Sequence, residues 1–294
     1  MNTKSLEHFL LLVRTLHFGR ASEEANISLS AMSRNIRQLE EEVGVSLFTR
    51  DNRSVVVTPE GKAFENYARE TLAKWDEIRR DLSDSSGKLQ GEISLYCSVT
   101  ASYSILFDLL NRFRPEYPDI DIKLHTGDPE HAISRVLSGD EEFCIAANPA
   151  NLPKTLLFKS ITDSPLVFIA PIDPRDQDIP AKPPTEVQQW AQVPMILSEG
   201  GIARTRVDQW FKAIKVTPRI YAQVAGNEAI VSMVSLGLGV GVVPKIVLDN
   251  SPFATRVQTL SVTPTLEPYE LGLITSKRNL KNPLIDAFWS MVDA

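Results

Sequence analysis

Arginines and small polar side chains gather between residues 28 and 58 of a 294-residue chain whose formal net charge is −6. Arginine bonds bidentately to guanine or binds a backbone phosphate, and serine and glutamine are flexible partners of base edges. The candidates for nucleic-acid contact are therefore Ser30, Ser33, Arg34, Arg37, Gln38, Arg50 and Arg53. Residues 1–90 hold 13 basic against 14 acidic residues, so such contact depends on local placement rather than on a basic excess.

Three short helices are expected around the first of these residues. Apolar side chains at helical spacing predict a helix over 4–16, and a second helix follows at 19–25. Ser28 is a suitable N-cap for a third helix, which Gly44 would end. The inward face of that helix would consist of Ala31 or Met32, Ile36, Leu39 and Val43. Three helices in this order are typical of a helix-turn-helix, although the third helix taken alone is also compatible with an ordinary solvated face.

A two-stranded wing is predicted directly after the third helix. Two strand-like segments, 45–49 and 54–58, flank the sequence RDNR, in which Asp51 and Asn52 favour a turn. Arg50 then lies at the base of the wing and Arg53 near its tip. A helix-turn-helix followed by a wing is much more specific than either part alone, so we predict a winged helix-turn-helix DNA-binding domain over residues 1–58.

A long helix with a heptad pattern should follow this domain. Thr58 is a suitable N-cap, Pro59 favours the first helical position, and the helical pattern extends to about Ser83. Its apolar seam consists of Phe64, Ala68, Thr71, Trp75, Ile78 and Leu82. Spacings of four and three residues are typical of a dimeric coiled coil, whereas packing of this helix on its own domain is the alternative. We assign residues 59–90 to a dimerisation helix and hinge.

The order of these parts resembles the LysR-type transcriptional regulators. The resemblance rests on FLLLVRTLHFGRASEEANIS, on LSAMSRNIRQLEEEVGVSLFTR and on VTPEG at the start of the long helix, and it extends over the whole chain. It implies that Ser30, Ala31, Ser33 and Arg34 face the major groove, with Arg37, Arg50 and Arg53 near the DNA backbone. It also implies a homodimer or homotetramer, an operator of inverted symmetry in double-stranded DNA and contact with RNA polymerase.

The rest of the chain alternates strands with helices. Strand-like segments lie at 92–98, 120–125, 142–147, 165–170, 194–197, 219–224 and 240–243. Helical patterns between them predict a mostly parallel sheet covered by helices, and a strand at 270–275 with a helix at 284–289 should return to the first lobe. We predict an α/β effector-binding domain over 91–294, with lobe I at 91–161 and 268–294 and lobe II at 162–267. LysR-type effector domains have this two-lobed architecture, which is that of type 2 periplasmic binding proteins.

Small polar turns follow several of the predicted strands. Ligands of open α/β sheets bind beyond the carboxyl ends of strands, where such turns offer free N–H groups and hydroxyls suited to a small carboxylate. The predicted effector-binding residues are Ser98, Thr100, Ala101, Gly127, Asp128, Ser198, Gly200, Asn227 and Glu228. For any single turn, the alternative is a helix cap without a ligand.

Four segments carry a narrower resemblance, to the LysR-type activators of the acetohydroxy acid isomeroreductase gene. These segments are CSVTASYS, KLHTGD, NEAIVSMV and RDNR. The resemblance implies that the inducer is 2-acetolactate or 2-aceto-2-hydroxybutyrate, whose carboxylate and hydroxyl suit the hydroxyls of Ser98 and Thr100. A LysR-type regulator of another small carboxylate is the alternative.

Other classes of function find little support in the sequence. There is no nucleophile elbow, dinucleotide fingerprint or metal-ligand spacing of histidines, so we expect neither an enzyme nor a metal or cofactor. No apolar run reaches about 18 residues, and we expect a cytoplasmic protein without a membrane partner, a solute-binding protein for transport being a distant alternative. Cys97 and Cys144 lie in apolar strand-like segments and should be buried thiols.

Overall fold

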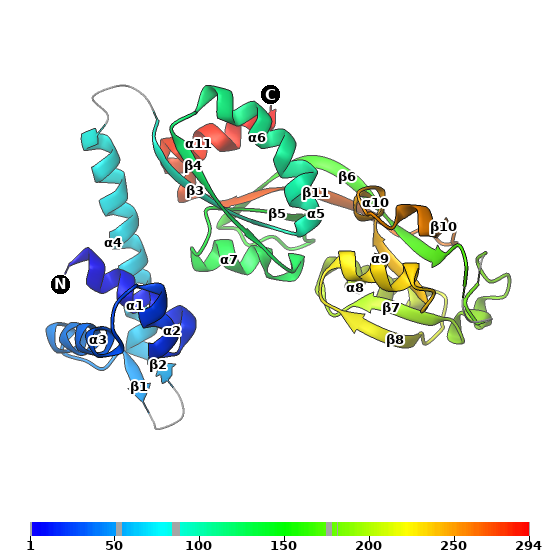
Figure 1. Cartoon of the computed structure of the whole chain (residues 1–294), viewed down its shortest axis with the longest axis horizontal. Coiled ribbons are helices and arrows are strands. Elements are labelled where there is room, and N and C mark those ends of the chain that lie inside the picture. The colour runs from blue at the N-terminus through cyan, green and yellow to red at the C-terminus, as the bar shows by residue number, and fades with distance from the viewer. Residues whose placement is uncertain (1, 51–54, 84–88, 175–177, 181, 294) are drawn as a thin grey trace. The chain divides into compact units, whose positions relative to one another are not determined.

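The computed structural model of the chain describes residues 2–50, 55–83, 89–174, 178–180 and 182–293. It divides into two compact units, Met1–Gly87 and Lys88–Ala294 (Figure 1). The first unit is a winged helix-turn-helix domain with a long helix, and the second is a two-lobed α/β domain. This architecture confirms the predicted fold class. No described helix is both long and apolar enough to cross a membrane.

The first unit begins with three short helices, each with its own cap. Its elements are α1 (Thr3–Thr15), α2 (Phe18–Glu24), α3 (Leu29–Val43), β1 (Phe48–Arg50), β2 (Val55–Val57) and α4 (Pro59–Ser83). The Ser28 hydroxyl accepts from the Ala31 N–H at 3.2 Å, and Gly44 ends α3 in the left-handed region with φ 80°. Both ends of α3 therefore follow from local chemistry, because a serine side chain satisfies a free N–H and glycine adopts positive φ without strain.

Aromatic rings and aliphatic side chains from all four helices form the core of this unit. Phe9 of α1 is fully buried and packs against Phe48 of β1 and Phe64 of α4, with ring centroids 5.4 and 5.0 Å apart. Met32, Ile36 and Leu39 form the buried face of α3. Val43, which we predicted on that face, is exposed, because the last turn of α3 extends past the core.

The start of α4 lies very close to the wing. The Thr58 hydroxyl accepts from the Gly61 N–H at 2.9 Å, which caps α4 as predicted. A Cβ added at Gly61 would lie 2.2 Å from the Leu47 carbonyl oxygen and 2.8 Å from Val57 Cγ1. Only glycine therefore fits at this position without a steric clash, and α4 and the wing share one packed junction.

Lobe I of the second unit is built on a sheet of order β4-β3-β5-β11-β6. Its strands are β3 (Gly91–Cys97), β4 (Ile120–Thr126), β5 (Phe143–Ala147), β6 (Leu156–Pro171) and β11 (Pro268–Ser276). Its helices are α5 (Val99–Tyr103), α6 (Ile105–Glu116), α7 (Ala132–Ser138) and α11 (Pro283–Ser290). The helices α6 and α11 cover one face of the sheet and α7 covers the other (Figure 1).

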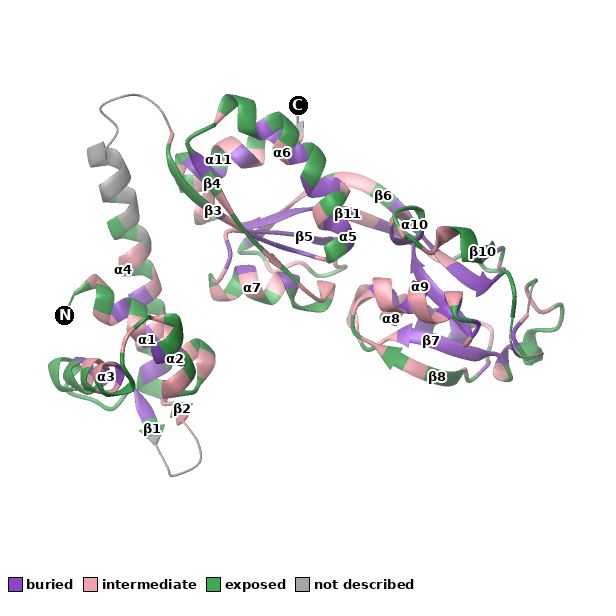
Figure 2. Ribbon diagram, in the orientation of Figure 1, coloured by how far each residue is buried: buried purple, intermediate pink, exposed green. Residues whose placement is uncertain are grey.

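Lobe II continues the same sheet from the second half of β6. Its strands are β7 (Pro194–Ser198), β8 (Arg219–Val224), β9 (Val240–Pro244) and β10 (Val257–Leu260), and its helices are α8 (Gly201–Ala213), α9 (Asn227–Ser235) and α10 (Lys245–Asp249). The order is β6-β9-β7-β8, and β10 pairs with β6. The central strands β5 and β9 are buried along their length, whereas the edge strands β4 and β8 carry exposed residues. Figure 2 shows this contrast for β5 and β8.

Candidate nucleic-acid interface and effector cleft

The described candidates for DNA contact lie on one side of α3 and at its first turns. Ser30, Arg34, Arg37 and Gln38 are exposed, and Ala31 and Ser33 are half-buried. Within the described part of the chain, neither Arg34 nor Arg37 has an ion-pair or hydrogen-bond partner. Both guanidinium groups are thus available to a phosphate or a base edge. The side chain of Arg50 and all of Arg53 lie outside the described residues.

Two polar contacts fix α3 in its domain. The Glu40 carboxylate accepts from the backbone N–H groups of Leu47 and Phe48 at 2.9 and 3.1 Å, which ties the wing to α3. Asn35 Nδ2 lies 2.9 Å from His8 Nδ1, which ties α3 to α1. Burial lowers the pKa of His8, which favours a neutral imidazole at that contact.

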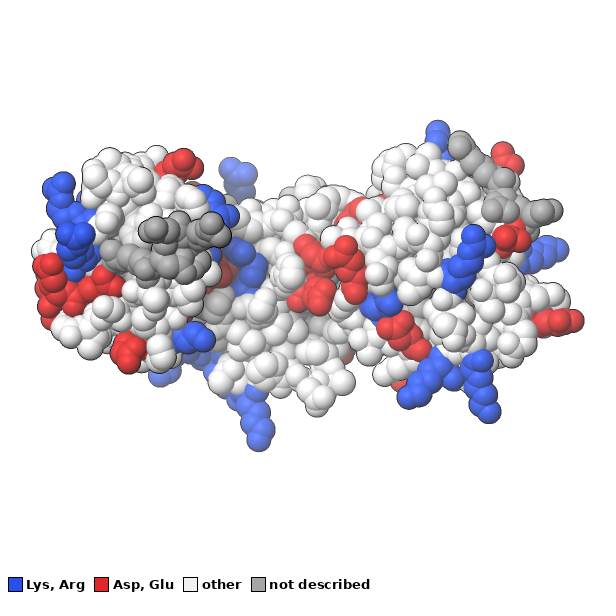
Figure 3. Space-filling view, turned by 90° about the horizontal axis from the view of Figure 1, so that it is seen from below, with Lys and Arg blue, Asp and Glu red and all other residues white. Residues whose placement is uncertain are grey.

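Basic and acidic side chains are interspersed on the face of the molecule seen in Figure 3. This agrees with the negative formal charge of the chain and leaves the exposed arginines of α3 as a local source of positive charge. Such contacts fix position and register on DNA even where the summed field is acidic.

The predicted dimerisation seam divides into two parts. Phe64 and Ala68 pack inside their own unit, and Ala68 is fully buried. For these two residues the structure shows the alternative, packing on their own domain, because a heptad pattern does not distinguish a partner helix from α1 of the same chain. The dimerisation seam itself stays a prediction. Trp75 and Ile78 are exposed, as is Tyr67 one turn before the half-buried Thr71. The side chain of Leu82 lies outside the described residues.

Two small cavities lie between the lobes of the second unit. The larger, of about 110 Å³, is lined by the loop 128–130 of lobe I and by the turn before α8 and the start of α9 of lobe II. The smaller, of about 30 Å³, is lined by α5 and by apolar side chains of β9 and α10. Asn227, which is 8% exposed, lines both cavities. The carboxyl ends of the strands therefore converge on a cleft, as expected for an open α/β sheet.

Most predicted effector residues meet at this cleft. Asp128, Ser198 and Gly200 line the larger cavity, and Ser98, Thr100 and Ala101 line the smaller one. Gly127 lines neither of these two cavities, because the hydroxyl of Tyr96 occupies the space beside it, 2.3 Å from where a Cβ would lie. Gly127 therefore packs directly against Tyr96, and its role in effector binding stays a prediction.

Polar groups of the cleft are hydrogen-bond donors and acceptors rather than cations. No Lys or Arg is among the described residues that line the two cavities, whereas Asp128 and Glu130 are. Glu228 does not line them, but its carboxylate accepts from the Thr100 N–H and hydroxyl at 2.8 and 2.6 Å. Sequence reasoning missed Glu130 and Tyr269, since neither has a local signal. Burial raises the pKa of Tyr269 to about 12, so its phenol stays neutral in the cleft.

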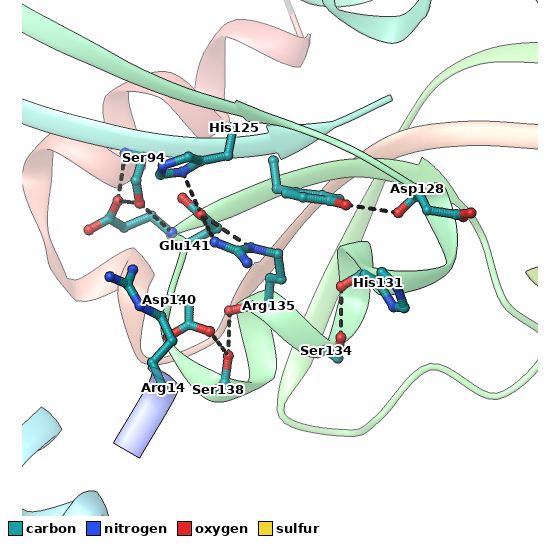
Figure 4. A network of polar contacts seen from close by, with 12 residues as sticks. Arg14, Ser94, His125, Asp128, His131, Ser134, Arg135, Ser138, Asp140 and Glu141 are labelled. Carbon is teal, nitrogen blue, oxygen red and sulfur yellow. Dashed lines mark hydrogen bonds and ion pairs between the residues drawn. The ribbon is translucent and has the colours of Figure 1, made fainter. Parts of the chain in front are cut away.

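A polar network around the buried Glu141 supports the edge of the cleft in lobe I. The fully buried Glu141 carboxylate accepts from Arg135 Nη2 at 2.8 Å and lies 2.7 Å from His125 Nδ1 (Figure 4). The Arg135 guanidinium stacks over the Tyr96 ring, 5.2 Å from its centroid, and the Tyr96 hydroxyl donates to the Asp128 carbonyl at 3.0 Å. The position of Asp128 is thus linked through Tyr96 to the charged cluster of Arg135 and Glu141.

Comparison with known proteins assigns both units. The sequence model described as "Bacterial regulatory helix-turn-helix protein, lysR family" matches residues 3–62, and that described as "LysR substrate binding domain" matches residues 86–294. The chain belongs to the LysR family. It is a DNA-binding transcriptional regulator with an effector domain, and its family is one of regulators rather than enzymes.

Relatives of this LysR regulator match it over nearly its whole length. The transcriptional activator IlvY of Salmonella typhimurium is 41% identical, with 99% of each chain covered. Full-length OxyR of Pseudomonas aeruginosa has the same fold at 20% identity, with a TM-score of 0.67 and 99% and 94% of the two chains covered. CbnR in complex with its target DNA gives a TM-score of 0.63 at 20% identity, with 100% and 99% covered.

Proposed function

We propose that this LysR regulator activates the acetohydroxy acid isomeroreductase gene of branched-chain amino acid biosynthesis. The observation that carries the proposal is its identity of 41% with the activator IlvY over 99% of both chains. The inducer is 2-acetolactate or 2-aceto-2-hydroxybutyrate, the two substrates of that enzyme. Like other regulators of chromosomal genes, the protein acts in the cytoplasm.

The cleft has the chemistry that such inducers need. A cavity of about 110 Å³ accepts a short branched acid rather than an extended ligand. Asn227 lines both this cavity and the adjoining one of about 30 Å³, where the hydroxyls of Ser98 and Thr100 match the polar groups of the inducer and Ile246 and Leu271 provide an apolar wall for its alkyl group. With no cation among the described lining residues, an inducer bearing a single charge is favoured over a dicarboxylate.

The DNA-binding form is a homodimer or a pair of dimers. Trp75, Ile78 and Tyr67 supply an exposed apolar face on α4 for a second copy of the chain. A two-fold dimer presents two α3 helices to half-sites of inverted symmetry. Ser30, Ser33 and Arg34 contact base edges, Arg37, Arg50 and Arg53 contact the backbone, and the bound dimers recruit RNA polymerase.

Calorimetry of the full-length protein tests the inducer. We expect saturable heat with 2-acetolactate and none with benzoate or muconate. Binding of an aromatic acid without any response to 2-acetolactate would contradict the pathway assignment and leave the family unchanged.

The substitution Arg34→Ala tests the recognition helix. Loss of a base or phosphate contact costs about 1–3 kcal/mol, and a dimer loses it in both half-sites, so footprinting of the isomeroreductase promoter should weaken at least tenfold at fixed salt. Lys62→Ala is the matched control, since Lys62 is an exposed cation of the same unit on α4. Normal footprints with Arg34→Ala, in a protein of unchanged circular dichroism, would exclude α3 as the reading helix.

A further inference from the structure

One carboxylate of lobe II occupies buried donors of lobe I. Thr100 is 1% exposed, and its backbone N–H and hydroxyl both donate to Glu228 Oε1. The Tyr103 hydroxyl lies 3.4 Å from Thr100 Oγ1 and donates to it, so the hydroxyl proton of Thr100 is directed at Glu228. The contact joins residues 128 positions apart in the sequence and links α5 of one lobe to the first turn of α9 of the other.

A second carboxylate crosses the cleft in the opposite direction. A Cβ added at Gly200 of lobe II would lie 2.3–2.6 Å from the Glu130 carboxylate of lobe I. The Glu130 carboxylate thus lies directly beside the turn that opens α8. Each lobe therefore inserts one acidic side chain against the backbone of the other.

We propose that Glu228 is an internal competitor of the inducer: its carboxylate latches the lobes together at Thr100, and a carboxylate inducer binds by displacing it. This inference rests on the proposed function and adds a mode of regulation to the same cleft. Two carboxylates at one pair of donors repel each other, and no Lys or Arg among the described lining residues offsets that repulsion. Binding of the inducer therefore breaks the Glu228–Thr100 contact and releases lobe II from lobe I.

The substitution Glu228→Ala in the full-length protein tests the latch without any inducer. Hydrogen exchange measured by mass spectrometry on peptides that span residues 98–104 should show the Thr100 amide exchanging at least tenfold faster. Millimolar acetate, a minimal free carboxylate, should then restore its protection in a saturable manner. The matched control is Glu199→Ala, which removes an exposed carboxylate next to the cleft and should show neither effect, as should the unmodified protein.

The second arm is calorimetry with 2-acetolactate. Glu228→Ala should bind it about tenfold more tightly than the unmodified protein, because charge-assisted hydrogen bonds are roughly twice as strong as neutral ones and must be broken only when Glu228 is present. Glu228→Gln, which keeps the shape and one acceptor, should give an intermediate affinity and covers the case in which the alanine variant fails to fold.

The results distinguish the latch at Thr100 from the proposed inducer. Unchanged exchange of Thr100 in both Glu228 variants, or no protection by acetate in a folded Glu228→Ala protein, overturns the latch. Weaker binding of 2-acetolactate by the variants also overturns it, because Glu228 is then a direct ligand of the inducer. Protection by acetate with no binding of 2-acetolactate to any form leaves the latch standing and removes the proposed inducer.

Discussion

The substitution Gly61→Ala should loosen the winged domain although it places alanine in a helix. In a helix, alanine is favoured over glycine by up to about 1 kcal/mol. At this position, however, the new Cβ would lie 2.2 Å from the Leu47 carbonyl oxygen. That carbonyl cannot turn away, because it accepts from the Thr58 N–H at 3.0 Å, and the Leu47 N–H is itself bound to Glu40.

The magnitude follows from the displacement that the clash requires. Restoring an ordinary contact moves α4 away from the wing by about 1 Å, and overpacking of this kind costs about 1–3 kcal/mol. After the gain in helix propensity, we expect a net loss of up to about 2 kcal/mol, which corresponds to a factor of up to about 30 in the opening equilibrium. Footprinting on the promoter should weaken as well, because the wing and α3 share this junction.

Hydrogen exchange of the α1 and α3 amides in the full-length protein measures this loss in the first unit alone. The control is Gly19→Ala, also in a helix of this unit, where the new Cβ meets only the ring of the exposed His17, at 2.9 Å. The ring can rotate away at the cost of its 3.2 Å capping contact with the Arg20 N–H. The gain in helix propensity offsets that loss, so the effect should stay within about 1 kcal/mol of zero. Equal or slower exchange in Gly61→Ala would refute the argument from the fixed carbonyl.

Two further predictions concern buried titratable groups of lobe I. Burial raises the pKa of Glu142 above its ordinary value of 4.5 although its carboxylate accepts from the Ser94 N–H. The folded state then binds the proton more tightly than the unfolded state, so stability falls as the pH rises from about 4.5 through the folded pKa. Glu142→Gln should therefore raise the Tm at pH 7 by a few degrees and leave it unchanged below pH 4.5; a lower Tm at pH 7 would contradict this. Burial also raises the pKa of Cys97 to about 12 and that of Cys144 further. Neither thiol should therefore react with Ellman's reagent at pH 8 until guanidinium unfolds the protein. Fast labelling of the native protein would show that one of the two thiols is accessible.

Local signals in the sequence were sufficient for most helices and strands. Ser28, Gly44 and Pro59 mark element ends because their chemistry satisfies or terminates a backbone within a few residues. The helix α10 and the strand β10 were missed, since each is short and depends on partners distant in sequence, as β10 does on β6. The first half of β6 was also missed, because Lys159, Ser160 and Asp163 interrupt any apolar alternation.

The candidate sites divide in the same way. Turn composition placed Thr100, Asp128 and Asn227 at one cleft because parallel strands bring their carboxyl ends to one edge. Nothing in the sequence shows that Glu228 reaches Thr100, since that contact depends on how the two lobes pack. Periodicity likewise identified the apolar face of α4 but not the fact that Ala68 would meet its own domain.

The strand β6 carries a mechanical consequence. Its residues 156–165 pair with β11 in lobe I, and its residues 166–171 pair with β9 and β10 in lobe II. A rotation of one lobe must therefore twist a continuous hydrogen-bonded ribbon instead of swinging on a loose connection, and the register shift between Leu271 and Gly272 interrupts the ribbon where β11 runs beside it. We expect such a joint to resist twisting, so that an inducer must supply the free energy of any change in the angle between the lobes.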